Sequence, residues 1–575
     1  MKNNCAKSLG LLFLWLLSSC STPSKDDSTI IIRLAQDPVS LNPISYGNGH
    51  SLQLLNYIYQ SLLVTELKDK SIKPLLAVDL PTIRRDDTSS YFTFTIRPEA
   101  NWDNNSPVTA KDVAFSLKLL HSPLLENERW RAQFDFIQDI QLSPTNPKVF
   151  TLVCKGYTPE MKLMTGDYFV LPAYLFDPNG IISNVPFRLI RQRFDSLSTT
   201  TTFKSFSKLI NNSNLARDTA FIKGSGPYRI TKWNSGQIVV LDKKKSWWGN
   251  KAEKGKNVLN NNPSRLFFQI IPDNAAAILA LKTRQIDVMD NVPLVSFLEM
   301  QKDLKYKEFY NFHSPPSYDL VYIGVNGKKK IFEDKQTRQA LAHLFNTSQL
   351  ISSVQGGLAT STVGLVHPQE EEFYNSELKK LEFDPNKAKT LLRLAGWQET
   401  TEGWQKTIRG KLEKLHMNLI YRGGNSDFEN IALLFKQNAL KIGIVVTLQP
   451  MESSQIGEKL QSKNFDLFIR TLMGNPYFYN FIPLLHSSNS KEGGGNITGF
   501  GTPATDLLLE QIAEEEHIIE KASLLKELQR KMQEESNMIF LYFMKNRIAI
   551  SKQIDSVVVS GIKPGYDVTR FIKKK

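Results

Sequence analysis

The chain has few residues of the types that carry catalysis or bind metals. It contains three cysteines, at positions 5, 20 and 154, and eight histidines spread singly along 575 residues. So few cysteines exclude a framework of structural disulfides, and no His-Glu-x-x-His pair offers the spacing of a zinc site. A Gly-x-Ser-x-Gly elbow, a Walker loop and a complete dinucleotide-binding glycine motif are also absent. We therefore expect no catalytic residue, no metal and no cofactor.

Long hydrophobic runs are also missing after the first twenty residues, so no later segment has the length of a membrane span. Residues 9–17 form a short apolar run behind two lysines, which is typical of a secretory signal. Leu17-Ser18-Ser19-Cys20 resembles the bacterial lipobox, whose cysteine is diacylated after the bond before it is cut. We expect a signal peptide over 1–19, lipidation of Cys20 and a disordered polar tether over 20–29.

Positive charge exceeds negative charge along the chain, with 71 Lys and Arg against 57 Asp and Glu and a formal net charge of +14. The basic residues occur in small separate groups, which are typical of solvated faces and tails. On an exported protein we therefore expect no nucleic-acid partner. Cys154 lies in a strand-like apolar run and is interpreted as a core residue. The acidic run at 514–517 is interpreted as a solvated helix face.

Short strand and helix patterns alternate along the chain. Residues 90–97 place Phe92, Phe94 and Ile96 on one face, which predicts a half-buried strand. Thr109 and Asp112 have the spacing of a capping box at the start of a helix. This alternation predicts an α/β protein with more than one lobe.

Three further segments allow a structural interpretation. Asp384 and Pro385 at the start and Gly396 at the end predict a helix. A single charged helix is predicted over about 505–535, with Leu508, Ile512 and Ile519 on its apolar stripe. The polar stretch 182–220 has few strong periods and is interpreted as an insertion or a long surface connection.

Several blocks occur in an order that resembles one known family, the bacterial extracellular solute-binding proteins of family 5, which include the oligopeptide- and dipeptide-binding proteins. The most diagnostic block is Trp102-Asp-Asn-Asn-Ser-Pro-Val-Thr-Ala-Lys-Asp-Val113. The others are Pro38-Val-Ser-Leu-Asn-Pro43, the helical 54–62, Phe94-Thr-Ile-Arg97, Gly224-Ser-Gly-Pro-Tyr228 before Trp247-Trp248, Gln285-Ile-Asp287, 334–341, 384–396 and Lys441-Ile-Gly-Ile444.

The resemblance implies a two-lobed fold like that of the periplasmic binding proteins, in the type II, large peptide-binding subclass. It implies lobe I over 30–300 with a subdomain at about 76–195, lobe II over 301–544 and a return to lobe I over 545–575. The implied function is to capture oligopeptides between the lobes and deliver them to an ABC permease by hinge closure. The implied partners are a peptide or other small solute, the permease and ATPase subunits and, through the lipid anchor, a bacterial membrane. We expect a monomer that is not an enzyme, on the periplasmic side in a Gram-negative host and on the extracellular face otherwise.

One family feature is missing from the chain. The loop over 470–488 resembles the family loop whose aspartate pairs with the α-ammonium of the ligand, but that aspartate would fall near Gly474, with Asn475 as the nearest polar residue. An amide there loses the charge-assisted hydrogen bond. Arg422 and Arg470 are candidate partners for a carboxylate. The candidate ligand-binding residues are Asn42, Tyr46, Trp102, Arg422, Arg470, Met473, Gly474, Asn475, Tyr477 and Tyr479.

The missing aspartate leaves alternatives to an ordinary peptide ligand. The solute is then an N-blocked or longer peptide, or a non-peptide such as a glycan, a metal chelate or an opine. A non-transporting sensor or chaperone lipoprotein and an exported hydrolase are further alternatives.

Overall fold

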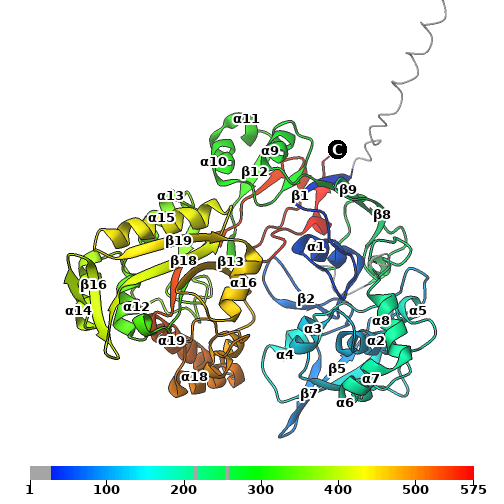
Figure 1. Cartoon of the computed structure of the whole chain (residues 1–575). Coiled ribbons are helices and arrows are strands. Elements are labelled where there is room, and N and C mark those ends of the chain that lie inside the picture. The colour runs from blue at the N-terminus through cyan, green and yellow to red at the C-terminus, as the bar shows by residue number, and fades with distance from the viewer. Residues whose placement is uncertain (1–27, 213–215, 253–257, 575) are drawn as a thin grey trace, which may run out of the picture.

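A seven-stranded mixed sheet combines strands from both ends of the chain (Figure 1). The computed structural model describes residues 28–212, 216–252 and 258–574. The predicted signal peptide and Cys20 lie outside the described residues. The strands in spatial order are β12 (Tyr310–His313), β22 (Ile548–Ser551), β11 (Val288–Met289), β1 (Thr29–Leu34), β10 (Arg265–Ile270), β9 (Ile238–Lys243) and β8 (Tyr228–Asn234).

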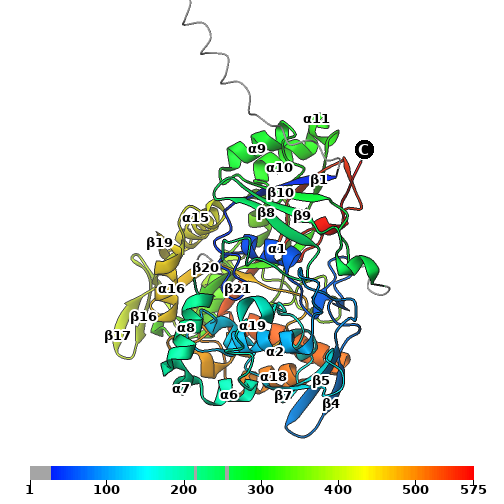
Figure 2. The same cartoon turned by 90° about the vertical axis from the view of Figure 1, so that its right-hand side faces the viewer.

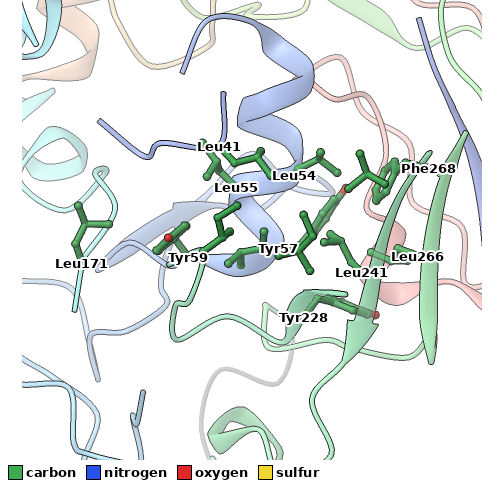
Figure 3. Packing of buried hydrophobic residues seen from close by; sticks show 14 of the residues in the cluster. Leu41, Leu54, Leu55, Tyr57, Tyr59, Leu171, Tyr228, Leu241, Leu266 and Phe268 are labelled. Carbon is green, nitrogen blue, oxygen red and sulfur yellow. The ribbon is translucent and has the colours of Figure 1, made fainter. Parts of the chain in front are cut away.

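Helices cover both faces of this sheet. Strand β1 is a nearly continuous apolar run in which Ile30 and Ile32 enter one hydrophobic cluster while Ile31 packs against another. Helix α1 (Gly49–Ile58) belongs to the first cluster, and its Leu54 and Leu55 are fully buried (Figure 3). Helices α9 (Asn274–Lys282) and α10 (Leu294–Lys302) cover the other face, with the short α11 (Leu304–Lys307) beside them (Figure 2). A strand that is buried on both faces reads as an apolar run because neither set of side chains meets water.

A second, four-stranded antiparallel sheet forms the lower part of the same half of the molecule (Figure 1). The predicted strand at 90–97 is confirmed as β5, and Phe92, Phe94 and Ile96 are all buried in one cluster. Cys154 is also buried there, and burial raises the pKa of its thiol to about 12. The strands in spatial order are β4 (Thr82–Arg85), β5 (Ser89–Thr95), β7 (Val149–Lys155) and β6 (Ile137–Leu142).

The capping box predicted at Thr109 and Asp112 is confirmed at the start of α2 (Ala110–His121). The Thr109 backbone N–H donates to the Asp112 carboxylate over 2.8 Å, and the Thr109 hydroxyl donates to the same oxygen over 3.0 Å. The carboxylate thereby meets the positive end of the helix. The helix packs its apolar stripe against the four-stranded sheet.

The described parts of the segment 182–220, namely 182–212 and 216–220, are largely helical, which the interpretation as an insertion or long surface connection did not specify. It forms α6 (Phe187–Gln192), α7 (Phe194–Thr199) and α8 (Thr201–Ile210), and Phe203, Phe206 and Ile210 are buried in the cluster around α1. These helices are short, and their apolar residues are separated by polar ones. A window that spans all three helices therefore shows no single helical period.

The other half of the molecule is built around a six-stranded sheet. Its central strand β13 places Val321 and Ile323 in one cluster and Tyr322 in another, so both faces are again covered. Helix α15 (Ser426–Leu440) packs on one face, where the Phe435 ring stacks on Phe345 with centroids 4.2 Å apart. The strands in spatial order are β14 (Ala359–Ser361), β21 (Met538–Lys545), β13 (Pro316–Val325), β20 (Leu467–Met473), β18 (His416–Arg422) and β19 (Val445–Met451).

The helix predicted from the aspartate-proline start is confirmed as α14 (Pro385–Leu394). The Asp384 carboxylate accepts from the Lys387 backbone N–H over 2.9 Å, and Gly396 has a φ of +84° just beyond the end of the helix.

The single helix predicted over 505–535 is wrong. The chain forms α18 (Pro503–Glu514) and α19 (Ile518–Glu535), separated at 515–517, and Ile519 is 79% exposed instead of lying on the apolar stripe. Ile512 and Leu525 enter the same hydrophobic cluster. Two helices that fold against each other bring both residues to that cluster, which one straight helix of this length does not.

The two halves are joined by crossing segments that lie side by side. The chain leaves the seven-stranded sheet after β12, enters the six-stranded sheet at β13, and returns between β21 and β22. The Asn546 backbone N–H donates to the Pro315 carbonyl over 2.9 Å, so the two crossings are hydrogen-bonded to each other. We call residues 28–313 with 546–574 lobe I and residues 316–545 lobe II. Among the described helices none has the length and apolarity needed to cross a membrane.

Candidate functional site

A cavity of about 410 Å³ lies between the two lobes. Lobe I supplies most of its wall, and lobe II contributes Asn475, Tyr477 and Phe478. This volume lies within the range of about 300–1,000 Å³ that is usual for small-molecule sites. The lobe I side of the wall includes Tyr59, Gln60, Glu66, Asp167, Phe169, Lys563, Asp567 and Arg570.

A second cavity of about 230 Å³ adjoins the first, and Asn475 and Phe478 line both. Its other lining residues come from lobe II and include Tyr318, His367, Met473 and Tyr479. The two cavities therefore lie on either side of Asn475 and Phe478, the first between the lobes and the second within lobe II.

The loop after β20 is held in place by its own backbone contacts. The Gly474 N–H donates to the Tyr318 carbonyl over 3.0 Å. The Asn475 side-chain oxygen accepts from the Tyr477 N–H over 2.9 Å and from the Phe478 N–H over 3.1 Å. That oxygen has two lone pairs and both are engaged. Asn475 therefore offers a ligand its amide N–H groups, and it does not replace an aspartate as the acceptor for an ammonium.

Direct contacts from this loop and its surroundings join the lobes. Tyr477 donates its hydroxyl to the Lys70 carbonyl, and burial raises the pKa of that hydroxyl to about 12. The Lys70 ammonium forms an ion pair of 2.9 Å with Glu370 of lobe II, and Glu370 also accepts from the Tyr318 hydroxyl. Tyr477 and Phe478 pack against the hydrophobic cluster of the four-stranded sheet in lobe I. The lobes are therefore in contact around the cavity.

A buried ion pair forms a further bridge between the lobes. The Lys521 ammonium of α19 lies 3.2 Å from the Glu160 carboxylate of lobe I, and the side chains are only 7% and 4% exposed. A more exposed pair, Arg85 with Glu516, joins the lobes nearby. The two charges come from different lobes, so this buried pair exists only where the lobes meet.

Two paired segments form part of the lobe I wall. The Val170 N–H donates to the Gln60 carbonyl over 2.9 Å, and the Leu63 N–H donates to the Gly166 carbonyl over 3.0 Å. Side chains alternate along such an extended segment. Asp167 and Phe169 accordingly line the cavity. Their neighbours Tyr168 and Val170 point the other way, into the core of the four-stranded sheet.

Asp167 is an unpaired carboxylate at this wall. Its side chain is exposed toward the cavity, and within the described residues its carboxylate forms no hydrogen bond or ion pair. Although water in the cavity reaches it, the surrounding protein removes much of its hydration. This desolvation raises the pKa of Asp167 from its usual value to about 6.

The other charged groups that line the large cavity already have partners. Arg570 pairs with Glu66 over 2.6 Å and with Asp567 over 2.9 Å. Lys563 pairs with Asp319 over 3.0 Å. Asp167 is thus the one carboxylate lining this cavity that has no cationic partner in the described part of the chain.

His367 provides a polar group in the smaller cavity. Its Nδ1 accepts from the Gln369 backbone N–H over 3.0 Å, so the ring proton lies on Nε2. Burial lowers the pKa of this histidine to about 4, which keeps the ring neutral. The buried Nε2 has no hydrogen-bond partner among the described residues. It offers an N–H donor to an acceptor in the cavity.

The candidate residues from the sequence fall into two groups. Met473, Gly474, Asn475, Tyr477 and Tyr479 line one or both cavities. They follow one another along a single loop, which explains why the resemblance located them together.

The remaining candidates lie outside the described cavities. The Asn42 side chain donates to the Ile210 carbonyl and accepts from the Ile44 N–H within the core. The Tyr46 ring packs against Trp130 with centroids 5.5 Å apart, and Trp102 is buried in the cluster of the four-stranded sheet. Arg422, at the end of β18, and Arg470, on β20, are exposed.

The lobe I wall was missed by sequence reasoning. Gln60 follows helix α1, and Asp167 lies in a Gly-Asp-Tyr-Phe stretch about a hundred residues later. No sequence motif links these two segments. Only the pairing of two segments about a hundred residues apart brings them together. Alternation along 166–170 was the one available sign, and it does not say which face meets a ligand. Among the described residues, no group of three or more His, Cys, Asp or Glu side chains is arranged to hold a metal ion.

Comparison with known proteins places this geometry in a class. The sequence pattern of the family described as bacterial extracellular solute-binding proteins, family 5, matches residues 71–493. The oligopeptide-binding protein AppA of Bacillus subtilis is 23% identical over 578 residues, with 96% of each chain covered.

Solved structures agree with the fold. The structure of AppA from Bacillus subtilis in complex with a nonapeptide superposes with a TM-score of 0.70 at 20% identity, covering 95% of this chain and 99% of that chain. NikZ from Campylobacter jejuni in complex with Ni(L-His) also has a TM-score of 0.70, at 19% identity, covering 95% of this chain and 100% of that chain. The fold is the two-lobed, type II periplasmic-binding-protein fold.

The chain belongs to the family 5 bacterial extracellular solute-binding proteins. This is a family of binding proteins and not of enzymes. The family is extracellular or periplasmic and supplies the solute-binding components of ABC transporters, including those for peptides.

Proposed function

We propose that this chain captures short peptides between its lobes and delivers them to an ABC permease. The observation that carries the proposal is the cavity of about 410 Å³, which both lobes line. A ligand there touches both lobes at once and favours their closed arrangement by its differential affinity. The peptide-binding relatives support a peptide as the ligand class.

Hinge closure is the proposed means of delivery. The hydrogen-bonded crossings at Pro315 and Asn546 form a narrow connection about which the lobes can rotate. The ion pairs Lys70–Glu370 and Lys521–Glu160 form only when the lobes meet. A permease that recognises the closed arrangement would then distinguish loaded from empty protein.

We also propose that the protein acts as a monomer tethered to a bacterial membrane through diacylated Cys20, on the periplasmic side in a Gram-negative host and on the extracellular face otherwise. The Cys20→Ala variant is expected to leave the membrane fraction. Unchanged membrane fractionation, together with no acyl mass on the native chain, would contradict the anchor.

The ligand class is tested by calorimetric titration of the ligand-free protein with a pool of random pentapeptides. Measurable heat that saturates near one peptide per chain is expected. Ni(L-His) and a neutral oligosaccharide serve as the comparison solutes in separate titrations. Heat from either comparison solute and none from the peptide pool would refute the peptide proposal and leave the family assignment intact.

A further inference from the structure

The cavity between the lobes has an excess of acceptors on the lobe I side. Of its charged lining residues, Arg570 and Lys563 are held by carboxylates, whereas Asp167 has no cationic partner in the described part of the chain. The Gln60 side-chain oxygen is buried without a hydrogen-bond partner and its residue lines the same cavity. A chain with a formal net charge of +14 thus has a locally acidic binding space.

Aromatic rings line the same cavity as these acceptors. Tyr59 and Phe169 line the cavity with ring centroids 5.9 Å apart, and they belong to the same two chain segments as Gln60 and Asp167. A carboxylate, an amide oxygen and aromatic faces that line one cavity are groups that stabilise a desolvated cation. The loop after β20 lacks such a group, because the Asn475 oxygen is occupied by two backbone N–H groups.

We propose that Asp167 is the recognition site for a cationic group of the ligand, with Gln60 accepting a further hydrogen bond from it. The cation is either the α-ammonium of a peptide or a basic side chain, because both present N–H donors with a positive charge. In this proposal the cation of the ligand is bound at the lobe I wall and not at the lobe II loop, where the family resemblance places the aspartate. The inference rests on the proposed peptide-binding function and names the group of the ligand that the cavity selects.

The proposal makes the affinity depend on pH in a defined direction. The raised pKa of Asp167, about 6 in the empty cavity, means that the group is protonated below that pH. A bound cation favours the ionised form, so affinity is expected to fall as pH drops from 7 to 5, by at most tenfold per unit for a single proton. The other charged groups lining the cavity are Glu66, Asp567, Arg570 and Lys563, and the first three are tied to one another.

The test compares three pentapeptide pools that contain no Lys, Arg or His except where stated. The first has free N-termini, the second is N-acetylated, and the third is N-acetylated with one Lys. Each pool is titrated into the wild type, Asp167→Asn and the control Asp195→Asn, in which an exposed aspartate of α7 is changed. The wild type and the control are expected to bind the first or the third pool at least tenfold more tightly than the second.

Asp167→Asn is expected to lose that preference and the pH dependence while still binding the second pool. Preference for the first pool identifies the α-ammonium, and preference for the third identifies a basic side chain. Binding of peptides by Asp167→Asn with an unchanged preference would overturn the inference while the proposed function stands. No heat from any pool with the wild type would overturn both.

Thermal unfolding separates recognition from a structural role. Desolvation raises the pKa of Asp167, so its ionised form opposes folding of the empty protein above pH 6. Asp167→Asn is therefore expected to keep or raise the Tm at pH 7 while weakening binding. A fall in Tm together with equal weakening for all three pools would show that Asp167 only supports the wall, and would refute the inference.

Discussion

The buried ion pair between Lys521 and Glu160 leads to a sharp prediction about closure. In Lys521→Met the Glu160 carboxylate stays buried in the closed arrangement without its partner, where the native ammonium lies 3.2 Å away. Removing one partner of a buried pair costs about 3–5 kcal/mol. We expect this cost to fall on the closed arrangement more than on folding, because Lys521 and Glu160 belong to different lobes and separate when the lobes open.

The magnitude follows from the population of closed molecules. If the lobes of the variant are mostly open when empty, the ligand must supply the cost of closing them. A cost of about 3 kcal/mol corresponds to roughly a hundredfold weaker apparent affinity. The double variant Lys521→Met with Glu160→Gln has no unpaired charge, and we expect it to recover most of the affinity.

The assay combines titration calorimetry with the pentapeptide pool and small-angle X-ray scattering of the empty protein. Lys521→Met is expected to bind weakly and to scatter with a larger radius of gyration, whereas the double variant resembles the wild type in both. The exposed pair Lys414–Glu402 within lobe II provides a matched control, and Lys414→Met is expected to change neither quantity. A large fall in Tm for Lys521→Met with unchanged affinity would refute the assignment of this pair to closure.

Three further predictions concern folding and reactivity. Cys154, whose burial raises its thiol pKa to about 12, is expected to resist iodoacetamide in the native protein at pH 8 and to react in urea; rapid native labelling would contradict its burial. Phe435→Ala, which removes a ring stacked on Phe345, is expected to lower the free energy of unfolding of lobe II by about 3–5 kcal/mol in a urea titration, and a loss below 1 kcal/mol would contradict that packing. Asp384→Ala, which removes the cap of α14, is expected to cost about 0.5–2 kcal/mol in the same assay, and an unchanged transition would refute the capping role.

Local structure was predictable where neighbouring residues decide it. The cap at Asp384 and the capping box at Thr109 each depend on residues within one helical turn, and the alternation of Phe92, Phe94 and Ile96 depends on one strand. The helix predicted over 505–535 failed because periodicity alone does not register a turn at which two helices fold back onto one core.

For the candidate site, the order of motifs located the lobe II loop but not its chemistry. The sequence shows Gly474, with Asn475 as the nearest polar residue, where the family resemblance places an aspartate. Only the structure shows that the side-chain oxygen of Asn475 already accepts hydrogen bonds from the backbone N–H groups of Tyr477 and Phe478. Arg422 and Arg470 were candidates by residue type, yet both are exposed away from the described cavities, because the position of a side chain around a strand depends on which face the sheet packs.

The sequence by itself determined the family, the two-lobed fold and the local elements, since these depend on patterns of adjacent residues and their order. The tertiary structure decided what lines the cavity. Gln60 meets the segment of Asp167 through long-range backbone pairing, and Lys70 meets Glu370 only when two lobes come together. Such contacts join residues that are distant along the chain, and their geometry is set by the packing of whole sheets.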